Sequence, residues 1–453
     1  MYDTIPNIQT HSRRITMKKT LLLSVVASTM IMAGGDIAPV EPIIVPVVES
    51  GWKFDGNMVA YYQTRDNTVA NDPTLAGDLS LFGTDASANN FGIQLRAVND
   101  DLFWGLGAGF EVTGMATSGL ISDMPGGAIQ TAGTYDHNIG GALTQAYLTY
   151  NIDMIDTGLK IGRQTLPKSL SPFAFSEQWT PVQNTFDAAL VVNSSIPDTT
   201  LVYAFVDKAN ASNGNLDTFG KIAYGPAVAT QTALDGVHMV TAQNKSIEGL
   251  TLTGSFYIAP KMVLTTDDLM VAWGDAKFNY DGYSVALQGG TIITGEPVAG
   301  IKNTIAYGAE IGAKYNLFDM NFDTSVAYSS VDNGTVGVFN AGGVKTPLYT
   351  QMILNQNKIS LNSNTVVARI GVEVLGGHLG VAYDMSTVVD AVPTATVTTL
   401  GNQLTADYAE LDVTYKTKIT DNTELFAAYV MTDDKALTDT QNFVRVWARY
   451  NFK

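Results

Sequence analysis

Apolar and polar residues alternate along the last thirteen residues of the chain, and this alternation limits the possible folds more than any other feature. One face carries Val444, Val446, Ala448, Tyr450 and Phe452, and the other carries Arg445, Arg449 and Asn451. A period of two predicts a β-strand. Aromatic residues on the apolar face and arginines opposite are typical of a barrel wall between lipid and water.

The same period recurs back to Trp52 and predicts eighteen strands joined by connections of alternating length. The candidate strands are 52–63, 91–98, 102–113, 142–152, 158–166, 184–193, 200–208, 235–243, 249–258, 267–278, 283–293, 303–316, 320–330, 365–374, 379–387, 405–416, 423–432 and 441–453. The first short turn is expected at Asn99–Asp101. The sequence therefore predicts an all-β fold, a transmembrane antiparallel β-barrel of about 18 strands over 52–453, with short periplasmic turns and long extracellular loops.

The beginning of the chain predicts export. Lys18 and Lys19 precede an apolar stretch from Leu21 to Ala33, which is shorter than the ~20 residues that a membrane-spanning helix needs. We therefore expect residues 1–33 to be an N-terminal extension plus a signal peptide that is removed, and residues 34–51 to be a Pro-rich extended lead-in. The expected destination is the cell outer membrane.

Composition excludes several classes of protein. Residues 1–33 hold four of the 26 Lys and Arg and one of the 43 Asp and Glu, so the remaining chain has a net charge of −20. Nucleic-acid binding needs a basic surface, so we expect no nucleic-acid partner. The chain has no cysteine, which excludes disulfides.

Side chains that could support catalysis or bind a metal are scattered. The four histidines show no metal-ligand spacing, and the serines lack a nucleophile-elbow context. Acidic pairs such as Asp100–Asp101 could bind calcium, but the ordered twelve-residue calcium loop is missing, which favours solvated turns. We expect no enzyme activity, no cofactor and no metal site.

Charged residues opposite the apolar face are the candidate pore-lining residues, because a charge facing lipid costs ~2–4 kcal/mol at mid-bilayer. They are Arg96, Glu111, Lys160, Glu310, Arg369, Glu373, Glu410, Asp412, Arg445 and Arg449. Each could set ion selectivity or simply form an ion pair in the wall, and the sequence leaves both alternatives open.

The third long loop, 166–183, contains three prolines and three aromatic residues. A loop that only extends into solvent has no need of such side chains, so we expect it to fold inward and narrow the channel, with Lys168 and Glu177 at or near the narrowest point. The alternative is that its aromatics pack at a subunit interface or under the outer loops. The constriction candidates are Lys168, Phe173, Phe175, Glu177 and Trp179.

Several short blocks resemble a known family. Residues 145–150, 159–164, 186–188 and 193–196 are similar in order and spacing to the fourth to seventh strands of epsilon-proteobacterial major outer membrane porins. The closing segments Val444–Val446 and Tyr450–Phe452 are similar too, and the chain resembles OprD-type porins more distantly. One departure is Lys453, which follows Phe452 where the family ends on the aromatic residue.

The resemblance implies an eighteen-stranded barrel, usually a homotrimer, that passes ions and small hydrophilic solutes. It also implies that Tyr450 and Phe452 form the signal for the barrel-assembly machinery, with outer-membrane lipid and lipopolysaccharide as surroundings. We therefore expect a porin for passive diffusion. Acidic loops favour cations, although wall arginines oppose this. A substrate-specific channel, an adhesin and a surface antigen are the alternatives.

Overall fold

The structure is a computed structural model, and it describes residues 51–66, 80–84, 86–117, 139–210, 216–222, 235–263, 267–294, 302–390, 403–437 and 439–453. The predicted signal peptide and almost all of the predicted lead-in lie outside these residues, so both stay predictions.

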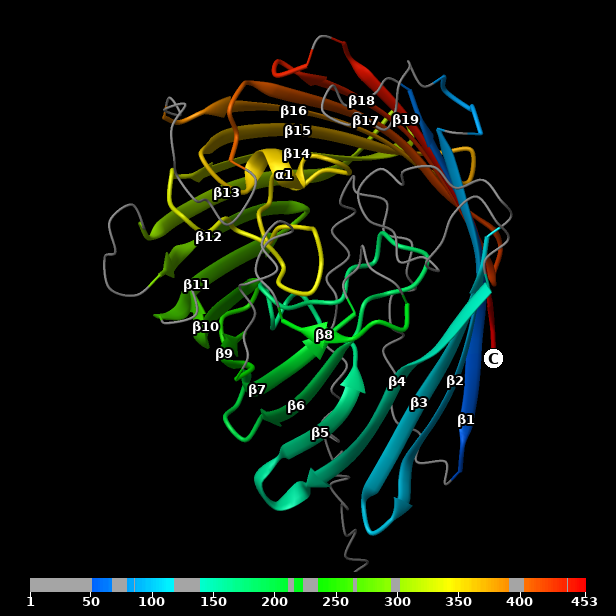
Figure 1. Cartoon of the computed structure of the whole chain (residues 1–453), viewed down its shortest axis with the longest axis vertical. Coiled ribbons are helices and arrows are strands. Elements are labelled where there is room, and N and C mark those ends of the chain that lie inside the picture. The colour runs from blue at the N-terminus through cyan, green and yellow to red at the C-terminus, as the bar shows by residue number, and fades with distance from the viewer. Residues whose placement is uncertain are drawn as a thin grey trace, which may run out of the picture.

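In the described part of the chain, eighteen long antiparallel strands form a closed β-barrel, because each strand pairs with the next and the last strand, β19, pairs with β1 (Figure 1). This confirms the predicted fold class. The wall strands are β1 (Lys53–Arg65), β2 (Ser87–Phe103), β3 (Leu106–Ala116), β4 (Ile139–Ile152), β5 (Thr157–Gln164), β6 (Phe186–Asn193), β7 (Thr199–Ala209), β9 (Val237–Asn244), β10 (Leu250–Val263), β11 (Asp267–Tyr280), β12 (Tyr283–Ile293), β13 (Thr304–Leu317), β14 (Met320–Val331), β15 (Ser363–Val374), β16 (Gly377–Val388), β17 (Tyr408–Thr420), β18 (Thr423–Asp434) and β19 (Gln441–Phe452).

Three short elements complete the described part of the chain. Strand β8 (Gly220–Lys221) pairs with the end of β7, the 3-10 helix η1 (Asp153–Ile155) joins β4 to β5, and helix α1 (Gln356–Ile359) lies in the loop between β14 and β15. Among the described residues, no helix is long and apolar enough to cross a membrane.

The first short turn differs from the prediction. Strand β2 does not end before Asn99 but continues to Phe103, which pairs with Leu106, so the chain turns at Trp104 and Gly105. A register shift between Asn99 and Phe103 interrupts the alternation there, and this irregularity made the polar segment resemble a turn.

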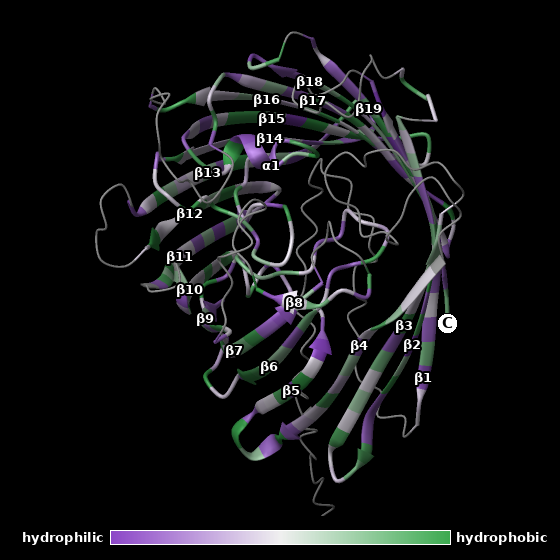
Figure 2. Cartoon of the chain, in the orientation of Figure 1, coloured by the Kyte–Doolittle hydropathy of each residue, from purple (hydrophilic) through white to green (hydrophobic). Residues whose placement is uncertain are grey.

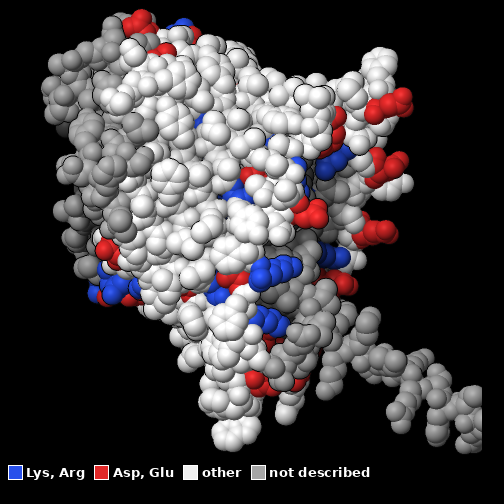
Figure 3. Space-filling model, turned by 90° about the vertical axis from the view of Figure 1, so that its right-hand side faces the viewer, with Lys and Arg blue, Asp and Glu red and all other residues white. Residues whose placement is uncertain are grey.

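The two faces of the wall differ as the alternation predicts. On β13, Ile305, Tyr307 and Ile311 are more than half exposed, whereas Glu310 between them is 7% exposed. Figure 2 shows this alternation of hydrophobic and hydrophilic residues along the strands. Much of the wall visible in Figure 3 carries no charged side chain. The outer face is therefore suited to lipid.

The main buried cluster lies inside the barrel. It joins inward side chains of the wall, such as Tyr257 and Trp273, to residues of two loops, such as Phe173 and Leu348. These loops are 165–185, between β5 and β6, and 332–362, between β14 and β15. We call them the third loop and the seventh loop.

Candidate functional site: a barrel interior narrowed by two loops

The third loop crosses the interior of the barrel. At one end, the Phe173 ring packs against Tyr257 of β10 and Trp273 of β11, with ring centroids 5.7 and 5.2 Å apart. At the other end, the Pro181 carbonyl accepts a hydrogen bond of 2.9 Å from Nη2 of Arg449 on β19. Because β10 and β19 lie on opposite sides of the ring, the loop spans the lumen between them.

The seventh loop also lies inside the wall, and it is anchored on carboxylates of β16 and β17. The backbone N–H of Ile353 donates to Asp412 at 3.1 Å, and that of Leu354 donates to Glu410 at 2.7 Å. Asn355 donates through Nδ2 to Asp384 at 2.8 Å. These three acids are completely buried, and one carboxylate oxygen of each accepts a hydrogen bond from the loop.

Wall residues of β11 and β15 hold the seventh loop from the other side. The Arg369 guanidinium donates to the carbonyl of Tyr349 at 2.8 Å and to Glu310 of β13 at 3.2 Å. The Tyr349 hydroxyl donates to the carboxylate of Asp275 on β11, and burial raises the pKa of this hydroxyl. These bonds attach the loop directly to four strands, β11, β15, β16 and β17.

Glu177 joins the two loops. Its Oε1 accepts hydrogen bonds from Nδ2 of Asn340 at 2.9 Å and from the backbone N–H groups of Val344 and Lys345 at 2.7 Å. Its Oε2 accepts a bond of 2.6 Å from Nε1 of Trp179. Glu177 is 1% exposed, so the structure places this carboxylate inside the contact between the loops.

Lys345 is a buried cation of the seventh loop. Its Nζ donates to the carbonyls of Met352 and Ile353 at 3.0 and 2.7 Å and lies 5.4 Å from the centre of the Trp179 ring. Burial lowers the pKa of Lys345 from 10.5 to about 8, and Arg445 lowers it further, while nearby acids including Glu177 oppose the shift. Lys345 is therefore a buried group whose ammonium loses its proton more readily than that of an exposed lysine.

The other predicted constriction residues also lie within the loop contacts. Lys168 donates through Nζ to the carbonyl of Thr346 at 3.2 Å and lies 5.3 Å from the centre of the Phe175 ring. Phe173, Phe175 and Trp179 are at most 5% exposed. Their roles in narrowing the channel remain predictions.

The predicted pore-lining residues occupy several environments. Glu310 and Arg369 pair, as do Arg96 and Glu111 at 3.2 Å. Lys160 lies 3.9 Å from the centre of the Tyr147 ring, and Glu373 is exposed beside the turn between β15 and β16. The residues that are less than 10% exposed are Glu111, Glu310, Glu410, Asp412, Arg445 and Arg449. Most of them contact a loop or each other rather than open solvent.

The inner face of β19 holds unpaired hydrogen-bond donors. Nε of Arg445, Nε1 of Trp447, and Nε and Nη1 of Arg449 are buried and have no hydrogen-bond partner among the described residues. The Arg445 guanidinium lies 5.1 Å from the centre of the Trp179 ring, so the third loop covers this face. A row of donors without acceptors can accommodate an anion or ordered water.

The predicted assembly residues lie on the outer face of β19. Tyr450 is 46% exposed, and its ring lies 6.2 Å from that of Phe452. Phe452 pairs in register with Gly56 of β1, and a Cβ on Gly56 would lie 2.7 Å from the Phe452 ring. The closing aromatic therefore packs over a glycine at the β1–β19 seam.

Sequence reasoning missed the seventh loop and its anchor Asp384. The signal that identified the third loop, apolar and aromatic residues in a connection, is also present in the seventh, where Val338, Leu348 and Met352 are completely buried. Asp384 lies two residues after Ala382 on the same strand, so both side chains share one face. The alternation of the strand could therefore have placed Asp384 on the inner face.

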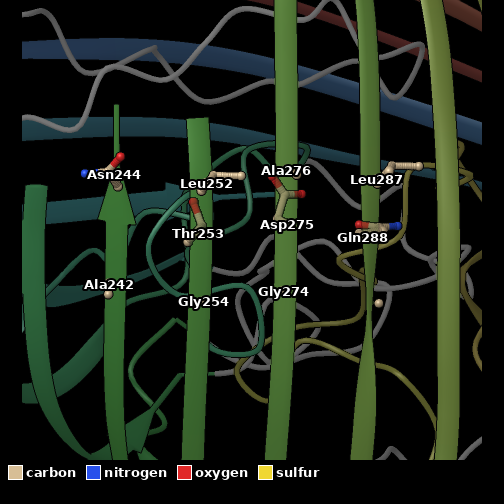
Figure 4. Close-up of a pocket in the computed structure, with 11 residues that line it drawn as sticks. Ala242, Asn244, Leu252, Thr253, Gly254, Gly274, Asp275, Ala276, Leu287 and Gln288 are labelled. Atoms are coloured by element: carbon tan, nitrogen blue, oxygen red, sulfur yellow. The ribbon is translucent and has the colours of Figure 1, made fainter. Parts of the chain in front are cut away.

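A hollow of about 590 Å³ lies along β9 to β12 (Figure 4). Gly254, Gly274 and Gly289 pair directly across adjacent strands in its lining. A Cβ on Gly254 would meet no atom within 4 Å. The hollow therefore results from missing side chains, and it is not a cleft with convergent polar groups. Among the described residues, no three His, Asp or Glu side chains could together hold a metal ion.

The fold and the lumen define a transmembrane β-barrel with an interior partly filled by two loops. No protein-family model matches the sequence, and no curated protein matches it. Among solved structures, the chain is similar to Pseudomonas aeruginosa OccK9 (OpdG), at 15% identity over 88% of this chain and 98% of that one, with a TM-score of 0.68.

Two other structures from the same organism give the same result. OpdK with vanillate has 15% identity, the same coverage of 88% and 98%, and a TM-score of 0.67. OccD3 (OpdP) has 14% identity over 93% of this chain and 94% of that one, with a TM-score of 0.62. The chain thus has the fold of OprD-type porins, whereas the closer resemblance to the epsilon-proteobacterial family is not confirmed.

Proposed function

We propose that this protein is an outer-membrane porin, a water-filled channel for the passive diffusion of ions and small hydrophilic solutes. The observation that carries the proposal is the closed eighteen-stranded wall with charged residues inside and two loops across the lumen. A barrel of this size is too wide for wall side chains to fill, so loops set its bore. The similarity to outer-membrane channels supports the same function.

The proposal includes export through the predicted signal peptide, insertion by the barrel-assembly machinery and assembly as a homotrimer among lipopolysaccharide and phospholipid. The sequence resemblance to the epsilon-proteobacterial porins supports these points. We also propose a preference for cations, because the chain after residue 33 has a net charge of −20.

Solute entry into liposomes tests the proposal. Vesicles that contain the folded protein should swell in isotonic solutions of small sugars and amino acids but not in large dextrans. Heat-denatured protein in matched vesicles is the control. Swelling that is no faster than in protein-free vesicles, with the barrel shown to be folded, would contradict the proposal.

A second candidate function is a channel selective for small carboxylates, and the buried donors of Arg445, Trp447 and Arg449 favour it. Vanillate, which the similar OpdK structure contains, is a suitable probe. In this case vanillate should block ion current through the wild type but not through Arg449→Gln. The uncharged vanillyl alcohol should block neither, and equal block of both proteins by vanillate would count against this function.

A further inference from the structure

The short turns at one end of the barrel expose large apolar side chains. Met154 is 93% exposed, Trp104 91% and Leu375 90%, although turns are usually rich in Gly, Asn and Asp. Six of the eight short connections carry such a residue, at least half exposed, namely Trp104, Met154, Ile196, Ile247, Phe318 and Leu375. The apolar tips thus recur around the circumference of the barrel.

Three of these residues occupy a backbone conformation that their side chains disfavour. Trp104, Phe318 and Leu375 each have φ of +54° and stand first in a two-residue hairpin turn. Asn, Asp and Gly are the residues that adopt this left-handed region readily. The local backbone therefore does not explain the choice of Trp, Phe and Leu at these positions.

The apolar tips continue the lipid-facing surface of the wall. On β13, Tyr315 and Leu317 are 41% and 47% exposed. Phe318, the next residue in the chain, is 81% exposed. On β4, Leu148 and Tyr150 are exposed on the outer face, and Met154 follows in η1. Apolar side chains therefore extend down the outer wall and onto the turn tips.

We propose that these turn tips insert into the phospholipid leaflet on the short-turn side and form a ring of lipid anchors. A planar lipid surface would meet tips at all positions around the barrel at once, whereas one globular partner would cover only part of the ring. Continuity with the lipid-facing wall favours the same occupant. The ring then fixes how deeply the barrel sits in the membrane, independently of what passes through the lumen.

Because the chain has no cysteine, a single fluorescent label tests the proposal without background. One variant, Leu375→Cys, carries an NBD label on a turn tip. The matched control carries the same label at Ala436→Cys, in the exposed connection between β18 and β19 at the opposite end of the barrel. In phosphatidylcholine vesicles with brominated acyl chains, the label at 375 should lose at least about half of its emission and resist quenching by iodide. The label at 436 should show the reverse.

A second pair of variants separates lipid contact from turn formation. Phe318→Asn and Leu375→Asn suit the left-handed backbone, so folding in detergent should be unchanged, while insertion into preformed vesicles should fall by about threefold. Two results would overturn the proposal: a label at 375 that brominated lipid does not quench, or Asn variants that insert as well as the wild type.

Discussion

At the scale of single residues, Glu177 is the group on which the arrangement of the two loops depends. It accepts four hydrogen bonds, three of them from the seventh loop, in a buried site. Its removal leaves those donors without an acceptor, and each buried unpaired group costs about 1–3 kcal/mol. Separation of the loops, which returns these donors to water, then costs less than in the wild type.

We predict that Glu177→Ala destabilises the loop–loop contact by about 3 kcal/mol or more without unfolding the wall. Single-channel recordings should show frequent steps to levels of higher conductance than the wild type. Glu177→Gln should be intermediate, because it keeps one acceptor oxygen. A variant with quiet, wild-type current would mean that Glu177 does not hold the constriction.

Lys345 predicts a pH dependence of defined sign. Its folded-state pKa of about 8 lies below its usual 10.5, so the buried ammonium destabilises the folded protein at low pH. As pH rises from about 8 to 10.5, the folded state loses this proton first and gains up to about 3 kcal/mol of stability relative to the unfolded state.

The comparison with Lys345→Met isolates this effect from other groups. The urea unfolding midpoint should be measured for both proteins at pH 7.5 and pH 9.5. Relative to the midpoint of the variant, the midpoint of the wild type should be higher at pH 9.5 than at pH 7.5. A difference that is constant over this range would show that the ammonium is not buried as described.

At the scale of elements, the eighteen strands were predictable and the path of one inward loop was not. A period of two is a local property, so each strand of the wall was identified from its own sequence, with errors only at ends and bulges such as Asn99–Phe103. The seventh loop depends on Asp384, Glu410 and Asp412, which are distant in sequence. Alternation placed the last two on the inner face but could not show what they bind.

The seam between β1 and β19 predicts an effect on assembly. The Phe452 ring packs over Gly56, so Phe452→Ala should reduce the yield of heat-modifiable barrel in cells more than deletion of Lys453 does. Gly56→Ala should also reduce the yield, because its Cβ would lie 2.3 Å from the carbonyl oxygen of Gln94. Equal yields for Phe452→Ala and wild type would refute the role of this contact.

At the scale of the whole molecule, the charge distribution predicts ion preference. The acidic loop residues that favour cations are Asp66, Asp72, Asp78, Asp85, Asp123, Asp136, Asp332 and Asp390, of which only Asp66, Asp332 and Asp390 lie in the described part of the chain. Asp66 accepts hydrogen bonds from Asn442, and Asp332 accepts one from Ile305. Two of these three acids therefore also have structural roles at the rim.

Reversal potentials under a salt gradient should show potassium more permeant than chloride at ~0.1 M salt. This preference should weaken at ~1 M, where the Debye length falls from ~10 Å to ~3 Å. Preference for chloride at low salt would show that the arginines of β2, β15 and β19 control the field inside the lumen.

The most direct test of the central claim is the current through single molecules of the purified protein in a planar lipid bilayer. A water-filled barrel narrowed by two loops should give discrete, uniform steps, and in concentrated KCl the current should rise roughly in proportion to salt. The contradicting result is a protein that passes no ion current at any voltage, although its heat-modifiable migration on a gel shows that it is folded and it is inserted in the bilayer. Such a result would show that this barrel is not a channel.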